Sequence, residues 1–306
     1  MTRAETEHFS VLKKNGRTFW LASFFLDRST ADAAARLYQF CRVLDDIADA
    51  GERAESSAAE RLAAIRSHFL GQEDRALPLS SEDLALGQLV QPLHVDPRII
   101  VALIDGLLWD LEHEPFTSQA QLLRYSYRVA GTVGVLMSGL LGCERNEGRY
   151  HAIDLGIGMQ LTNISRDVLE DAGMQRRYVP AEVDVASLAV ARPSEAMQNA
   201  LVTVIALSEK HYDSGIKGIR YLPRLVRPCV YLMAVLYRAI SRKIVRSTYA
   251  WQRGRITLSW FEIALRLLGS LPMCLWLTVV PSYKNGEMNH SAGLHDALSG
   301  LPGVNE

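Results

Sequence analysis

The chain of 306 residues has little cysteine and almost no net charge. Its four cysteines, Cys41, Cys143, Cys229 and Cys274, are widely spaced and form no Cys-x-x-Cys pair. This spacing argues against a disulfide framework or a zinc site, and it favours a reducing, cytoplasmic location. Lys and Arg total 33 and Asp and Glu total 34, which leaves a net charge of −1. Without a basic excess, nucleic acid is not an expected partner.

Patterns that would indicate other architectures are also missing. The first 17 residues contain no apolar stretch of the signal-peptide type. There is no internal repeat, no low-complexity linker and no Gly-x-Gly-x-x-Gly dinucleotide fingerprint. Val- and Ile-rich alternating strands joined by Asn-Gly or Asp-Gly turns are absent, and nearly every long segment has a helical period instead.

The helical periods predict an all-α fold. Helices are expected at roughly 4–24, 30–50, 54–71, 81–91, 96–114, 118–142, 147–172, 195–217, 224–252 and 258–279. Because 48% of the residues are hydrophobic and most breaks are short, we expect one helical bundle around a central space, spanning residues 1–283. The polar tail at 284–306 is expected to be partly disordered.

One apolar segment requires a membrane check. Residues 260–281 are interrupted by Glu262, Arg266 and Pro272. The uncharged run at 267–280 is too short to cross a bilayer, which needs about 20 residues. We therefore expect a buried core helix, and the alternative is a helix that rests on a membrane or lines an apolar cavity.

Residues 37–50, LYQFCRVLDDIADA, place three aspartates in an otherwise apolar segment. Residues three or four apart share a helix face, so Tyr38, Arg42, Asp45 and Asp49 form one stripe. The other faces are apolar, which predicts a buried helix. Buried carboxylates are costly unless they are paired, hydrogen-bonded or bound to metal.

A second stripe follows more than a hundred residues later, in GIGMQLTNISRDVLED at 156–171. It consists of Asn163, Asp167 and Asp171, with Gln160 and Arg166 close by. If the two helices face each other, their oxygens form one cage. Such oxygens suit Mg²⁺, which completes its octahedron with waters and substrate phosphates. The stripes therefore predict metal-assisted ionisation of an allylic diphosphate, with the hydrocarbon in an apolar cavity.

These motifs resemble the squalene/phytoene synthase family of head-to-head prenyl diphosphate condensing enzymes, and most closely its bacterial phytoene synthases. The two stripes resemble the family's two aspartate-rich motifs. YSYRVAGTVG at 125–134 resembles its Tyr-Cys-x-x-Val-Ala-Gly-x-Val-Gly signature, RRYVP at 176–180 its Arg-x-Tyr-x-Pro, and LYRAI places Tyr237 at a matching position. The resemblance covers about residues 10–255 and implies the class I isoprenoid synthase fold.

The resemblance implies a role for each motif residue. The implied metal ligands are Asp45, Asp49, Asn163, Asp167 and Asp171. The implied catalytic residues are Tyr38, Arg42, Tyr125, Arg166 and Tyr237. The implied substrate-binding residues are Arg17, Thr18, Phe19, Arg42, Val129, Val133, Gln160, Arg166, Arg176 and Tyr178.

Some of these positions also have plainer interpretations. Gly131 and Gly134 could serve tight helix packing alone. Tyr125 could be a core tyrosine, and Arg176 with Arg177 could be a solvated pair.

The sequence also departs from the family pattern in two places. NGRTF at 15–19 lacks the histidine of the family's His-Ser-x-Ser-Phe, and Ser126 stands where cysteine is common. Neither change removes a metal ligand, so we expect activity to be kept.

The implied reaction has two steps and depends on Mg²⁺, with Mn²⁺ as an alternative. One prenyl diphosphate ionises, and the double bond of a second attacks the cation to give a cyclopropylcarbinyl diphosphate, which ionises again and rearranges. We expect two geranylgeranyl diphosphates to give phytoene for carotenoid biosynthesis. The alternative is two farnesyl diphosphates, which would give dehydrosqualene, presqualene diphosphate, hydroxysqualene or, with NADPH, squalene.

Because these products are insoluble in water, we expect peripheral contact with the inner face of the membrane through residues 259–281. A downstream desaturase is a further expected partner.

Three rival functions remain open. DDIAD at 45–49 also fits a chain-elongating prenyltransferase, but NISRDVLED does not repeat that motif. A class I terpene cyclase would carry Asn, Ser or Thr, and Glu, which Asp167 and Asp171 fit poorly. A catalytically dead scaffold relative could lose its acidic ligands, yet all five positions are filled.

Overall fold

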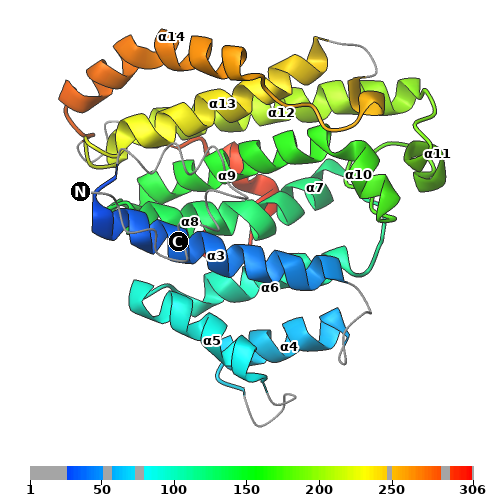
Figure 1. The fold of residues 1–306 in the computed structure, drawn as a ribbon, viewed down its shortest axis with the longest axis horizontal. Coiled ribbons are helices and arrows are strands. Elements are labelled where there is room, and N and C mark those ends of the chain that lie inside the picture. The colour runs from blue at the N-terminus through cyan, green and yellow to red at the C-terminus, as the bar shows by residue number, and fades with distance from the viewer. Residues whose placement is uncertain (1–25, 51–56, 73–78, 247–249, 284–289, 305–306) are drawn as a thin grey trace.

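The computed structural model describes residues 26–50, 57–72, 79–246, 250–283 and 290–304, and the regular elements in these ranges are all helices (Figure 1). The longer ones are α3 (Arg28–Ala50), α4 (Ala58–Phe69), α5 (Ser81–Val90), α6 (Pro97–Asp110), α7 (Gln119–Ser126), α8 (Thr132–Leu140), α9 (Asn146–Arg166), α10 (Val168–Gly173), α11 (Val185–Ala189), α12 (Glu195–Gly218), α13 (Arg227–Val245) and α14 (Trp260–Val279). Short turns are η4 (Gln91–Leu93), η5 (Tyr127–Gly131), η6 (Ile219–Tyr221), η7 (Ala250–Arg253) and η8 (Ala292–Leu298).

The predicted all-α class is confirmed. The helix expected at 4–24, and with it the candidates Arg17, Thr18 and Phe19, lies outside the described residues.

Local sequence signals set where several helices begin. The Asp27 carboxylate accepts a hydrogen bond from the backbone N–H of Thr30 in the first turn of α3. Pro97 occupies the first turn of α6, where its missing N–H would have no partner within the helix. Ser259 and Glu262 form a reciprocal capping box at the start of α14.

Helix α9 lies in the middle of the bundle and packs against α8, α12 and α13 (Figure 1). Glycines allow this close approach. A Cβ on Gly134 of α8 would lie 2.2 Å from the carbonyl oxygen of Ala152 in α9. A Cβ on Gly218 of α12 would lie 2.1 Å from the Cβ of His151. Gly134 therefore serves tight helix packing, and it also borders the cavity described below.

The helix predicted over 118–142 is interrupted. Residues 127–131 form a π-helical turn, η5, between α7 and α8. Such turns often occur at functional sites because they change the direction of neighbouring side chains. The predicted helix at 147–172 also breaks, at Asp167, and the expected gap at 173–194 contains the short helix α11.

The prediction that α14 is a buried core helix is wrong. Helix α14 packs against α13 along one side and lies at the outer edge of the bundle (Figure 1). Its exposed large apolar residues are Trp260, Phe261, Leu265, Leu268, Leu271, Met273, Leu275, Trp276 and Val279. Only Ser270 and Leu277 of this helix are buried.

Within the tail expected to be partly disordered, the structure describes residues 290–304, and these pack against the bundle. Leu298, Leu301 and Val304 are buried in the same apolar cluster as residues of α7 and α9. Arg124 donates hydrogen bonds to the carbonyl oxygens of Ala297 and Ser299. This segment packs against the bundle because it brings its own apolar side chains.

Candidate active site

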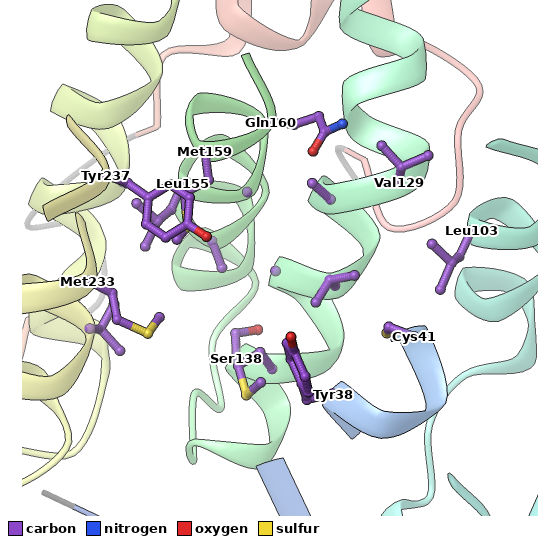
Figure 2. Close-up of a pocket in the computed structure, with 18 of the residues that line it drawn as sticks. Tyr38, Cys41, Leu103, Val129, Ser138, Leu155, Met159, Gln160, Met233 and Tyr237 are labelled. Carbon is purple, nitrogen blue, oxygen red and sulfur yellow. The ribbon is translucent and has the colours of Figure 1, made fainter. Parts of the chain in front are cut away.

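A cavity of about 360 Å³ runs between α3, α6, α8, α9 and α13. Along α9 its wall extends from Gly148 to Asn163, which corresponds to about 22 Å of helix. Most of the wall is apolar, and the labelled side chains in Figure 2 come from several helices around one space. The polar lining includes Tyr38, Arg42, Asp45, Gln160 and Asn163.

The first predicted stripe reaches this cavity from α3. Tyr38, Arg42 and Asp45 line it, and Asp49 lies one turn further along the helix. Arg42 donates a hydrogen bond of 2.9 Å to Asp45. Burial, reinforced by the charge of Asp49, raises the pKa of Asp45 to about 6 despite the opposing effect of Arg42. Burial also raises the pKa of Tyr38 to about 12.

The second stripe lies at the junction of α9 and α10. Asn163 lines the cavity, and Asp167 stands between the two helices. Arg166 donates a hydrogen bond of 2.8 Å to Asp167, and Arg255 approaches the same carboxylate at 3.5 Å. Burial, followed by repulsion from Asp167, raises the pKa of Asp171 well above its usual range. Arg255 was not predicted from the sequence.

Arg176 connects the two stripes. Its guanidinium donates a hydrogen bond of 2.9 Å to the Asp49 carboxylate, and its backbone N–H donates to the carbonyl oxygen of Asp171 at 2.9 Å. Arg176 is buried, so its interpretation as one of a solvated pair with Arg177 is wrong. The charge of Arg176 also acts on the Asp171 carboxylate, so one arginine lies near the ends of both stripes.

A buried aspartate that the sequence reasoning missed completes this region. Asp110, at the end of α6, accepts hydrogen bonds from the hydroxyls of Tyr125 at 3.0 Å and Tyr178 at 2.8 Å. The two phenol rings stack with centroids 4.7 Å apart. Burial raises the pKa of Asp110 to about 6, although both hydroxyl hydrogen bonds lower it. The only feature of the sequence that could have indicated this role is the position of Asp110 at the end of the largely apolar segment IIVALIDGLLWD.

The remaining predicted site residues line the cavity from different helices. Val129 lines the cavity from η5 and Tyr237 lines it from α13 (Figure 2). Val133 lines it from α8. Gln160 accepts a hydrogen bond of 3.2 Å from the Asn163 side chain. Burial raises the pKa of Tyr237, so its hydroxyl stays protonated.

The oxygens of the two stripes suit a hard divalent cation. Asp45 and Asp171 have raised pKa values because each negative charge is buried beside another. Such carboxylates gain most from a nearby cation. Carboxylate and amide oxygens of this kind suit cations that keep waters and share a diphosphate.

Known proteins resemble this chain over most of its length. The family model for squalene/phytoene synthase matches residues 12–262. A phytoene synthase of Pseudescherichia vulneris is 29% identical over 274 residues, covering 85% of this chain and 89% of that protein. A phytoene synthase of Thermus thermophilus is 30% identical over 264 residues, covering 84% of this chain and 89% of that protein.

Solved structures share the fold. A dehydrosqualene synthase superposes with a TM-score of 0.71 at 22% identity, covering 88% of this chain and 95% of the other. A squalene synthase from Alicyclobacillus acidocaldarius has a TM-score of 0.64 at 19% identity, covering 81% and 95%. The order of the five motifs, the cavity and the family match agree, and the chain therefore belongs to the squalene/phytoene synthase family.

Proposed function

We propose that the chain is a prenyltransferase that joins two geranylgeranyl diphosphates head to head, through a cyclopropyl diphosphate intermediate, and releases phytoene. The observation that carries this proposal is that residues of both stripes, Asp45 and Asn163, line one largely apolar cavity. Phytoene is favoured over a C30 product because the relatives that are 29% and 30% identical to this chain are phytoene synthases.

Mg²⁺ bound between Asp45, Asp49, Asn163, Asp167 and Asp171 would supply Lewis-acid stabilisation of the departing diphosphate. The chain's own residues do the rest. Arg42, Arg166 and Arg176 can donate paired hydrogen bonds to diphosphate oxygens. Each of these guanidinium groups donates a hydrogen bond of 2.8–2.9 Å to an aspartate of the two stripes, which supports a position next to the proposed cation site.

The cavity wall would protect the cation from water and stabilise its charge during ionisation. Its apolar side chains, among them Val129, Val133 and Leu155, exclude water that would otherwise trap the cation. The Tyr125 ring, held by its hydrogen bond to Asp110 and its stacking on Tyr178, presents an aromatic surface beside the polar end. An aromatic face stabilises a nearby cation by roughly 1–2 kcal/mol.

Product analysis tests the proposal. Purified protein is incubated with Mg²⁺ and either geranylgeranyl or farnesyl diphosphate, with and without NADPH, and the extract is read by mass spectrometry. Phytoene from the C20 substrate without NADPH is the expected result. A C30 hydrocarbon as the sole product would retain the chemistry and overturn the substrate assignment. No product from either substrate would support the scaffold alternative.

We also propose that α14 rests on the cytoplasmic face of a membrane. Among the described residues, it is the one helix whose length and composition would allow it to cross a bilayer. Phe261, Leu268 and Leu275, spaced seven apart, are 77%, 64% and 68% exposed. Trp260 and Trp276 of this helix are also exposed, and tryptophan is enriched where proteins contact the membrane interface. Transfer of product to a membrane-bound desaturase stays a prediction.

Exchange of Phe261, Leu268 and Leu275 for serine is expected to lower partitioning into anionic liposomes at least about tenfold, because each exposed side chain loses its transfer free energy. Flotation of the protein with vesicles measures this. Leu84→Ser, an exposed leucine on α5, is the matched control and should bind like the wild type. Unchanged partitioning of the triple variant would refute the contact, and a shift from dimer to monomer instead would identify α14 as a self-association surface.

A further inference from the structure

A second cluster of ionisable side chains lies away from the aspartate stripes. The chain has eight histidines, and four of them, His151, His211, His290 and His295, gather around the carboxylate of Asp154. Asp154 is 0% exposed. The proposed reaction uses none of these five residues, although His151 also borders the cavity.

The geometry of the cluster centres on both oxygens of Asp154. Oδ2 lies 2.7 Å from Nε2 of His290, and Oδ1 lies 3.1 Å from Nε2 of His295. Nδ1 of His211 lies 2.8 Å from Oδ1, and the Ser214 hydroxyl donates to Oδ2. The rings of His290 and His295 have centroids 4.2 Å apart.

We propose that Asp154, His290 and His295 bind a transition-metal ion of the zinc class. One nitrogen or oxygen atom from each of the three lies within 4.8 Å of the others. Two imidazoles and a carboxylate are a ligand set that zinc accepts and magnesium disfavours, and a water would complete the tetrahedron. The widely spaced cysteines had argued against zinc, but no sequence pattern indicates that distant histidines converge.

The rings of His211 and His295 are each held by Asp154 from one side. Nε2 of His211 and Nδ1 of His295, the ring nitrogens opposite those that face Asp154, are buried without a hydrogen-bond partner in the described structure. His211 and Ser214 also hold the Asp154 carboxylate in place from α12. Metal-binding carboxylates are usually oriented by such outer hydrogen bonds.

The site would be structural rather than catalytic. The side chains of His290 and His295 are 4% and 0% exposed, so no substrate can reach the ion. His290 and His295 belong to the segment at 290–304, whereas Asp154 belongs to α9. The ion would therefore fasten this segment to the bundle. The segment in turn contacts η5, since Tyr127 donates a hydrogen bond to the carbonyl oxygen of Pro302.

The test measures metal content, so its result is independent of the proposed activity. Untagged full-length protein is unfolded, refolded with Zn²⁺, dialysed against a weak chelator and analysed by plasma mass spectrometry. One zinc ion per chain is expected. The double variant His290→Gln, His295→Gln should lose it, because glutamine can still donate to Asp154 but is a poor zinc ligand. Binding is expected to weaken at least about 100-fold.

An exposed histidine outside the cluster provides the control. His113→Asn removes an exposed histidine at a left-handed backbone position that asparagine tolerates, and it should keep the zinc. Refolded wild type without bound zinc would overturn the proposal and leave a hydrogen-bonded cluster. Equal zinc in the folded double variant would also overturn it, because the ion would then lie elsewhere.

Discussion

Alanine at Asp45 or at Asp171 is expected to reduce turnover by at least about 10³-fold while leaving the helical fold intact. Each change removes a carboxylate from the proposed cation site, and stabilisation of a departing diphosphate by bound cations contributes several kcal/mol. The fold should tolerate the loss because burial and neighbouring charges already raise the pKa of both groups. Initial rates at saturating Mg²⁺, with circular dichroism of the same samples, measure both effects.

The matched control for these variants is Asp32→Ala. Asp32 lies on the same helix as Asp45 but pairs with Arg36 at 2.8 Å, four residues along the surface. Such pairs contribute about 0.3–0.5 kcal/mol, so rate and stability should stay close to the wild type. Near-normal turnover in either the Asp45 or the Asp171 variant would refute the joint cation site.

Gly134→Ala should destabilise the fold by roughly 1–3 kcal/mol or more. The added Cβ would lie 2.2 Å from the carbonyl oxygen and 2.9 Å from the carbonyl carbon of Ala152. Both atoms are backbone, so α8 and α9 must move apart, and overpacking of this kind is costly. The cavity wall would shift with them, because Gly134 and Ala152 both line it. Urea unfolding measures the loss.

Gly139 provides an internal comparison on the same helix. A Cβ at this position meets nothing within 4 Å, so Gly139→Ala should be neutral or stabilise the protein by up to about 1 kcal/mol. If Gly134→Ala unfolded at the same urea concentration as Gly139→Ala, the close α8–α9 contact would not exist in solution.

Much of the site was predictable because helical period and residue chemistry are local properties. The spacing of Tyr38, Arg42, Asp45 and Asp49 is by itself enough to define one face of α3. The same reasoning missed Asp110, since it lies five residues after Asp105 in α6 and the two carboxylates therefore form no stripe on one face. Its partners, Tyr125 and Tyr178, come from later segments that only the fold brings together.

Burial of whole segments was harder to predict than their helical form. Helix α14 is apolar on nearly every face, so its sequence does not indicate whether another helix covers it. The segment at 290–304 mixes apolar residues with polar ones. His295 is buried beside Asp154, which lies 141 residues earlier in the chain, so the local sequence does not reveal this partner. The π-helical turn at 127–131 was also missed, because one extra residue in a turn hardly changes the apolar pattern of α7 and α8.

The most direct test of the joint site is a crystal structure with Mg²⁺ and a thio-linked prenyl diphosphate that cannot ionise. Mg²⁺ is expected between the α3 carboxylates Asp45 and Asp49 and the second stripe of Asn163, Asp167 and Asp171. The diphosphate should bridge the ions, and the hydrocarbon should lie along α9 toward Gly148. Diphosphate bound elsewhere, or cations held by only one stripe, would contradict the claim that the two acidic helices form a single site.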